Sequence, residues 1–248
     1  MATIGGRPPC TVVVSQPMYF PWVGLLEQIR LADVFVHYDD VALARGFSNR
    51  VQLKTAAGPR WLTVPLAEWH RGQLIDEVRI DESRDWRRSQ FDLLRQTYAA
   101  APHVEEMLEL VARVHHQPAA SLADLAIAST IAVADYFGLC DGRRFVRSST
   151  LSVQGAKSAR LLAILANCGG TRYITGHGAK DYLDHEAFDA VGIEVRYMDY
   201  QRIAYPQLHG TFTPYVSSLD LIANLGKIGG DVIRSDAVHW KEFLREQG

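Results

Sequence analysis

Residues 12–50 have the sequence VVVSQPMYFPWVGLLEQIRLADVFVHYDDVALARGFSNR. The β-branched run Val12–Val14 predicts a buried strand, and the apolar residues from Leu25 recur at helical spacing as far as Asp33. Val34–Val36 predicts a second buried strand. The stretch therefore predicts a strand–loop–helix–strand unit, from which open α/β sheets are built.

The residues around this unit predict a ligand crevice. In open α/β sheets, ligands bind outside the carboxyl ends of the strands. An aromatic loop follows the first strand, and two carboxylates follow the second. We therefore expect one crevice to be surrounded by Gln16, Tyr19, Phe20, Trp22, Asp39 and Asp40. The three aromatic rings either stack on a sugar or a base, or they pack at a tight turn.

The composition of the chain argues against several classes of protein. Of its 248 residues, 48% are hydrophobic and 22% are charged, which is typical of a globular protein with a large core. A net charge of −2 gives no electrostatic footprint for nucleic acid or a membrane surface. The apolar runs are too short to span a bilayer, and the first ten residues lack the apolar segment of a secretory signal.

The cysteine content points to the compartment. The three cysteines are odd in number and have no zinc-binding spacing, which suits a reducing environment without disulfides. We therefore expect a cytoplasmic protein with no metal site, no nucleic-acid partner and no membrane partner.

The middle of the chain predicts a hairpin followed by helices. The alternating runs 51–54 and 61–66 flank a turn and predict an antiparallel hairpin, and residues 75–80 predict a further strand. Helical periodicity then covers residues 85–98, 104–114 and 121–137. The last of these helices is apolar almost all round, so it should be central and buried. We expect one α/β domain over residues 1–248, in which residues 85–140 form a helical subdomain.

The second half alternates between strand and helix patterns. Strands are expected at residues 145–146, 173–175 and 193–198, and helices at residues 156–168, 181–191 and 217–226. The tail from Asp236 is expected to form a short amphipathic helix.

Several motifs, in order along the chain, carry a family resemblance. They are QPxxFPWxGLL from Gln16, ADxFVxYDDV from Ala32, Ser48–Arg50, Trp61 with Pro65, Tyr173–Gly176, Gly178–Leu183, Tyr205–Gln207 and Ser217–Asp220. The ordered set resembles the WbqC-like protein family over residues 12–226. The resemblance implies a cytoplasmic biosynthetic enzyme, a transferase, that serves surface polysaccharides, amino sugars or specialised metabolites such as natural products.

The order of the first elements is also similar to the nucleotidyltransferase-like α/β fold. In that fold an HxGH turn binds nucleotide phosphates. Here Pro21-Trp22 precedes Val23-Gly24-Leu25, so both histidines are replaced, and the usual charge stabilisation of a transferred phosphoryl group is lost. The expected fold is a Rossmann-like (nucleotidyltransferase-like) α/β sheet with an inserted hairpin and a helical subdomain, and the altered turn counts against nucleotidyl transfer.

The early charged residues predict chemistry at the sheet edge. Asp39 and Asp40 point to opposite faces if both continue the strand, so one would act as general base while the other orients the loop. The alternative is a strand-end turn in which aspartate bonds the local backbone. Asn49 and Arg50 combine an amide with a guanidinium fork that suits carboxylate or phosphate. For this second pair the alternative is a salt bridge to one of the two aspartates.

The segment Gly176–Lys180 predicts a second anion site. It follows a strand and opens a predicted helix, where the free amides beside Gly176 and Gly178 can bind phosphate or carboxylate. Lys180 would add positive charge, and His177 is the best placed of the nine histidines for acid–base chemistry. The alternative is a plain turn between strand and helix.

Two further pairs complete the set of substrate-binding candidates. Lys157 and Arg160 fall in the first turn of a predicted helix, where a bound anion would explain their positive charge. A solvated face is the alternative. Ser217 and Asp220 fit the N-cap and the first-turn acid of the helix that follows them.

These observations predict an enzyme that transfers an acyl or aminoacyl group to an amine or hydroxyl of a sugar nucleotide or specialised metabolite. The pair Asp39–Asp40 would supply the base, Arg50 and the Gly176–Lys180 loop would hold phosphate or phosphopantetheine, and His177 would assist proton transfer. No tightly bound cofactor is expected. A CoA or carrier-protein thioester would be the co-substrate, with an acyl carrier protein as partner. The alternatives are a non-catalytic ligand-binding protein and a degenerate nucleotidyltransferase-like enzyme.

Overall fold

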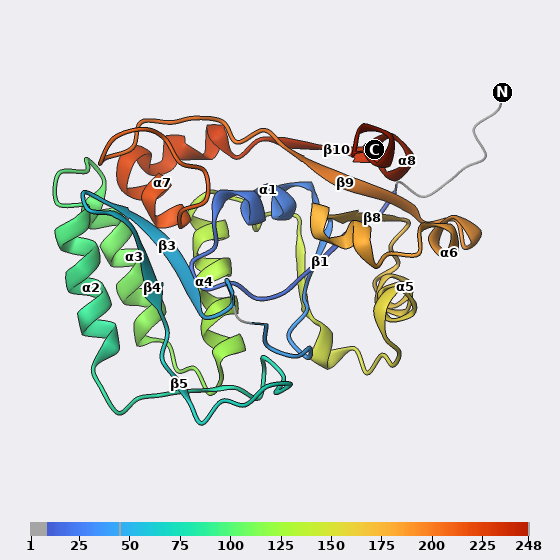
Figure 1. Cartoon of the computed structure of the whole chain (residues 1–248), viewed down its shortest axis with the longest axis horizontal. Helices are drawn as coiled ribbons and strands as arrows, with labels where there is room; N and C mark the ends of the chain where they lie inside the picture. The colour runs from blue at the N-terminus through green and yellow to red at the C-terminus, as the bar shows by residue number, and fades with distance from the viewer. Residues whose placement is uncertain (1–8, 45, 248) are drawn as a thin grey trace.

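The computed structural model describes residues 9–44 and 46–247, and in this part of the chain a six-stranded sheet forms the centre (Figure 1). The strands lie in the order β10-β9-β8-β1-β2-β7 and span Ser235–His239, Glu194–Tyr200, Arg172–Thr175, Thr11–Ser15, Val34–His37 and Arg144–Arg147. Neighbouring strands pair in parallel, except β10, which runs antiparallel to β9. This mostly parallel sheet confirms the α/β class.

The strand order places β1 where the chain changes its direction across the sheet. β2 and β7 extend the sheet on one side of β1, and β8 and β9 extend it on the other. Ligands of open α/β sheets bind at such a switch point, outside the carboxyl ends of the strands. Gln16, Tyr38 and Gly176 directly follow β1, β2 and β8 at this end.

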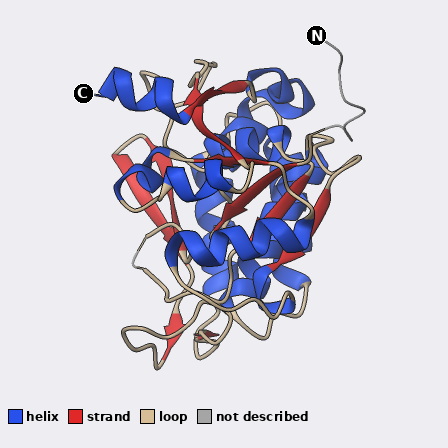
Figure 2. Cartoon of the chain, turned by 90° about the vertical axis from the view of Figure 1, so that its right-hand side faces the viewer, coloured by secondary structure: helices blue, strands red, loops and turns tan. Residues whose placement is uncertain are grey.

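Alternating side chains of the strands form two apolar cores, as the strand period of two requires. Val13 and Phe35 share one core with α1 (Val23–Leu31), and Val12 and Val36 share the other with the helices of the opposite face. Those helices are α5 (Lys157–Cys168), α6 (His185–Ala190) and α8 (Trp240–Gln247). Figure 2 shows helices on both sides of the strands.

The chain between β2 and β7 forms a separate layer of hairpins and helices, to the left in Figure 1. Its elements are β3 (Arg50–Thr55), β4 (Gly58–Thr63), β5 (Leu66–Ala67), β6 (Arg79–Ile80), α2 (Trp86–Thr97), α3 (Val104–His116) and α4 (Leu122–Tyr136). The hairpin β3–β4 and the three helices confirm the sequence predictions. A reciprocal capping box of Ser121 and Asp124 starts α4. α7 (Ser218–Leu225), from the end of the chain, packs on α3.

Four details differ from the sequence predictions. The strand expected at residues 75–80 is reduced to β6, because Leu74 forms a turn with Glu77. The helix expected at residues 181–191 is a 3₁₀ turn followed by α6. The tail begins with β10, in which Ser235 and Ala237 are buried and Asp236 is exposed, a strand period that is too short to recognise in the sequence. α4 keeps a part-exposed stripe that includes Ala128.

Within residues 9–44 and 46–247, none of the helices combines the length and the apolar character that crossing a bilayer requires.

α1 carries a buried carboxyl group on the side of β10. Glu27 is 2% exposed, and its Oε2 atom has no hydrogen-bond partner among the described residues. Burial raises the pKa of Glu27 from 4.5 to about 7, although Ser235, Arg30 and Arg202 act in the opposite direction. The folded protein therefore holds this proton more tightly than the unfolded chain does.

This proton makes stability depend on pH. The stabilisation is complete below pH 4.5 and is lost as the pH rises through 7, because ionisation is then penalised only in the folded state. We expect Glu27→Gln to equal the wild type near pH 4.5 and to exceed it by up to about 3 kcal/mol at pH 8. Urea unfolding at both pH values measures the difference. A difference that is the same at both pH values would contradict the assignment.

Candidate functional site

Asp39 lies just past the carboxyl end of β2 and is held by the strand next to it. Its carboxylate is fully buried and accepts hydrogen bonds from Arg147 Nε at 2.6 Å, from the Ser149 amide at 3.0 Å and from the Ser149 hydroxyl at 2.9 Å. Burial alone would raise the pKa of Asp39, but the bonds from Ser149 and Arg147 lower it below its ordinary value. This carboxylate is already fully engaged, which makes it a weak base.

β2 ends at His37, and Asp40 lies in a bend after it, so the two aspartates do not continue the strand to opposite faces. The Ser148 hydroxyl lies within hydrogen-bonding distance of both carboxylates. The Asp40 carboxylate pairs with the Arg160 guanidinium and accepts from the Ser148 hydroxyl, and one fifth of its side chain is exposed. Arg160 also lies over the ring of Tyr38, 5.1 Å from its centroid. The positive charge of Arg160 is thus explained by Asp40, without a bound anion.

A third carboxylate, Asp76, reaches the same edge from the inserted layer. The Asp76 amide donates to the Asp39 carbonyl at 3.1 Å. Its Oδ1 atom is buried and has no hydrogen-bond partner among the described residues. Burial and the negative charges of Asp39 and Asp40 raise the pKa of Asp76. Asp76 therefore has the unpaired oxygen and the raised proton affinity that a general base needs.

Sequence reasoning missed Asp76 because its segment reads as an ordinary strand. The segment instead pairs with the chain that continues beyond β2, where Ile75 donates to the carbonyl of Val41 and Leu74 bridges Ala42. The sequence did contain one signal for a special role of Asp76, namely a carboxylate directly after the apolar Ile75 in a segment predicted to be a strand.

Arg50, at the start of β3, lines a pocket of about 220 Å³ in the inserted layer. Its guanidinium forms no ion pair with any described residue, and its Nε atom is buried without a hydrogen-bond acceptor. The guanidinium stacks on Trp61 at 4.3 Å from the ring centroid. Because Asp39 and Asp40 hold other arginines, a salt bridge to them does not account for Arg50. Its positive charge remains available to a ligand.

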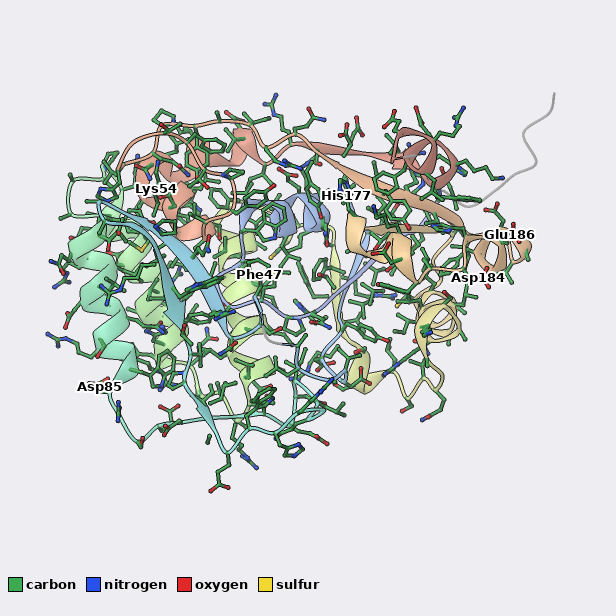
Figure 3. The ribbon with its side chains drawn as sticks, viewed as in Figure 1. Phe47, Lys54, Asp85, His177, Asp184 and Glu186 are labelled. Carbon is green, nitrogen blue, oxygen red and sulfur yellow. The ribbon has the colours of Figure 1, made fainter. Side chains whose placement is uncertain are left out.

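An exposed aromatic pair adjoins this arginine. Phe47 and Trp61 are 45% and 40% exposed, and their ring centroids lie 6.4 Å apart. Figure 3 shows Phe47 near the middle of the molecule, between the hairpin and the sheet. Asn49 also lines the pocket, and its side-chain amide donates to the Val64 carbonyl at 3.2 Å. Asn49 thus supports the pocket wall while Arg50 supplies the charge.

The aromatic residues after β1 serve mainly packing. Tyr19 and Phe20 are fully buried. Phe20 has a positive φ of 40°, and this conformation is held by two hydrogen bonds: its amide donates to the Ser129 hydroxyl, and its carbonyl accepts from the Ser217 hydroxyl. Trp22 is half-buried and lies flat against Gly24, where an added Cβ would come within 2.2 Å of the indole. Gln16 is half-buried directly after β1.

His177 faces β9 and not the predicted crevice. It opens the short 3₁₀ turn His177–Asp181, and its Nε2 donates to the Met198 carbonyl at 2.6 Å. The ring packs between Tyr200 and Phe243, with centroids 5.4 and 4.8 Å away. In Figure 3 His177 lies apart from Phe47. These contacts give the imidazole a structural part in the join between β8 and β9.

Packing explains one of the two glycines of this loop, Gly176, whereas a Cβ at Gly178 would meet nothing within 4 Å. A Cβ at Gly176 would come within 3.2 Å of the Tyr200 hydroxyl, which itself bonds Gln28 at 2.6 Å. Gly178 and Lys180 are exposed. The loop directly follows β8, whose carboxyl end lies at the same sheet edge as that of the parallel strand β2. The Arg50 pocket has no wall from this loop.

The remaining candidates divide between surface and core. Lys157 is exposed. Ser217 caps α7 through the Leu219 amide. Asp220 is fully buried and accepts from Tyr98 and Tyr205 at 3.1 and 2.9 Å. These contacts hold the loop before α7 in place.

Fold and site together define an α/β protein with a mostly parallel sheet, acidic residues at its carboxyl edge and a positively charged pocket in an inserted layer. The chain belongs to the WbqC-like protein family, whose family model matches residues 16–231. It is 33% identical over 227 residues to the uncharacterized protein Rv1507c of Mycobacterium tuberculosis (strain ATCC 25618 / H37Rv), and the match covers 90% of this chain and 97% of that protein. No solved structure matches the chain.

The contacts of Asp39 predict a structural cost for losing its partner. Arg147→Met leaves the buried carboxylate without its counter-charge, and we expect the free energy of unfolding to fall by about 3 kcal/mol. Arg160→Met is the matched variant. It should cost about 1 kcal/mol, because water still reaches Asp40. Urea unfolding at pH 7 measures both. Equal losses for the two variants would contradict the structural role of Asp39.

Proposed function

We propose that this protein is a transferase that moves an acyl or aminoacyl group onto an amine or hydroxyl of a sugar nucleotide or specialised metabolite. The observation that carries the proposal is Arg50, an arginine without a carboxylate partner in the wall of a pocket. A phosphate of CoA, of a carrier's phosphopantetheine or of a sugar nucleotide supplies the missing negative charge. The exposed rings of Phe47 and Trp61 offer a surface for the body of that ligand.

The acidic edge supplies the base in this proposal. Asp76 takes the role that the sequence assigned to the Asp39–Asp40 pair, because its Oδ1 is unpaired and its pKa is raised. An amine nitrogen attacks the thioester carbonyl, a C–N bond forms and the C–S bond breaks. Asp76 accepts the N–H proton and passes it to the departing thiolate. Asp39, Arg147, Asp40 and Arg160 hold the edge in position.

The sheet itself supports a Rossmann-like, nucleotidyltransferase-like assignment. Its parallel strands lie in the order β7-β2-β1-β8-β9, which corresponds to the order 3-2-1-4-5 of a doubly wound sheet. Trp22 and Pro21 occupy the turn where the nucleotidyltransferases carry histidines. The strand order thus supports a fold shared with the nucleotidyltransferases, and the replaced histidines support a reaction other than nucleotidyl transfer.

Ligand-induced stabilisation tests the proposal. We expect coenzyme A or a sugar nucleotide to stabilise the wild type, by about 2.7 kcal/mol at 100 times its Kd. Arg50→Gln should weaken that binding at least about tenfold, the loss of one charge-assisted contact. Arg60→Gln, at an exposed arginine of the same hairpin, is the control and should bind as the wild type does.

The outcomes separate the competing functions. Unchanged affinity in Arg50→Gln would refute the pocket assignment. Stabilisation by ATP alone would favour a degenerate nucleotidyltransferase-like enzyme. Binding by the wild type with no transfer from a CoA or carrier thioester to any amine would favour a ligand-binding protein. Asp76→Asn should abolish transfer and leave the ligand affinity unchanged.

A further inference from the structure

A second pocket lies between α2 and α3, away from the Arg50 pocket. It has a volume of about 370 Å³ and mainly apolar walls, and it is lined by Asp85, Arg87, Arg88, Phe91, Ala112, His115 and His116. Figure 3 shows Asp85, one of the lining residues, at the end of α2. The volume is within the range of small-molecule sites. His115 connects the pocket lining to the core, because its Nε2 lies 2.7 Å from the hydroxyl of the fully buried Tyr19.

The hydrogen bonds behind this wall have a fixed direction. Gln90 Nε2 donates to the Thr63 carbonyl at 2.8 Å, so its Oε1 atom faces Tyr19. An amide oxygen only accepts, and the Tyr19 hydroxyl therefore donates its single proton to Oε1 at 2.7 Å. At the 2.7 Å contact between Tyr19 and His115, the hydroxyl oxygen must accept and His115 Nε2 must donate.

Because Nε2 donates to Tyr19, the other ring nitrogen of His115, Nδ1, is the atom left for a ligand in the pocket. Burial, with the positive charges of Arg87 and His116, lowers the pKa of His115 to about 4, so its ring is neutral at pH 7. A neutral ring with its proton on Nε2 carries a lone pair on Nδ1. Nδ1 has no hydrogen-bond partner in the described part of the chain. It is also not buried, so a ligand can reach it. The pocket therefore offers a hydrogen-bond acceptor in an apolar wall.

We propose that this pocket binds a small, neutral hydroxylated aromatic molecule, a phenol, whose O–H group donates to His115 Nδ1. The acceptor requires a donor, which excludes carboxylates and other ligands without a proton to give. The guanidiniums of Arg87 and Arg88 already pair with Glu82 and Asp92, so neither is left to hold an anion, and the apolar part of the wall disfavours the burial of a further charge.

Phe91 lines the pocket and offers an aromatic face to the ligand. Trp86 packs against the His115 ring, with centroids 5.4 Å apart, and holds that ring in place.

A matched pair of probes tests the site. 4-Fluorophenol and 4-fluoroanisole have similar shapes, but only the phenol has a proton to donate. We expect ¹⁹F NMR titration of the whole protein to show at least tenfold tighter binding of the phenol. His115→Phe should abolish this preference, and His70→Phe, at an exposed histidine outside the pocket lining, should keep it. Equal binding of the two probes, or a preference that survives in His115→Phe, would overturn the proposal.

The tautomer of His115 is an independent test that needs no ligand. Side-chain ¹⁵N NMR at pH 7 should show a neutral ring protonated at Nε2, and 4-fluorophenol should shift the Nδ1 resonance. Tyr19→Phe removes the acceptor of the Nε2 proton and should release the tautomer preference. A ring protonated at Nδ1, or a cationic ring at pH 7, would contradict the hydrogen-bond direction and with it the proposal.

Discussion

Arg147 joins three parts of the chain that the sequence keeps far apart. Its Nε contacts Asp39 at 2.6 Å, and a second nitrogen contacts Asp124 at 2.7 Å. Asp39 follows β2, Asp124 belongs to the capping box of α4, and Arg147 ends β7. The inserted layer is thus tied to the sheet at both of its ends. Because a buried carboxylate without its partner is costly, this contact fixes the edge on which the candidate site is built.

The charges at this edge divide into satisfied and unsatisfied groups. Asp39 and Asp40 each hold an arginine, and their contacts explain their positions without a ligand. Arg50 and Asp76 each carry a buried polar atom that the described residues leave unpaired, and neither has an ion-pair partner among them. By contrast, Arg160, whose Nε is also unpaired, pairs with Asp40. Unpaired charge is costly in a folded protein, and for this reason we propose Arg50 and Asp76 as the groups that meet a ligand. The proposed function rests on this division and not on the number of charged residues.

Local patterns in the sequence were enough to predict most elements. The unit from Val12 to Val36, the β3–β4 hairpin and the three inserted helices follow from side-chain periodicity, turn residues and a capping pair. The partners of the site residues were out of reach, because Asp39 finds Arg147 across 108 positions. The sequence likewise could not show that His177 Nε2 donates to the Met198 carbonyl, 21 positions away. Which charged side chains stay without a partner depends on contacts between residues far apart in the sequence, and the local spacing of residues does not reveal those contacts.

The central claim is that the unpaired guanidinium of Arg50 receives the anionic group of a substrate. A crystal structure of the protein with bound coenzyme A tests it most directly. We expect a phosphate oxygen within hydrogen-bonding distance of the Arg50 guanidinium, with the ligand lying along Phe47 and Trp61. A phosphate bound at residues 176–180, with Arg50 left unoccupied, would contradict it.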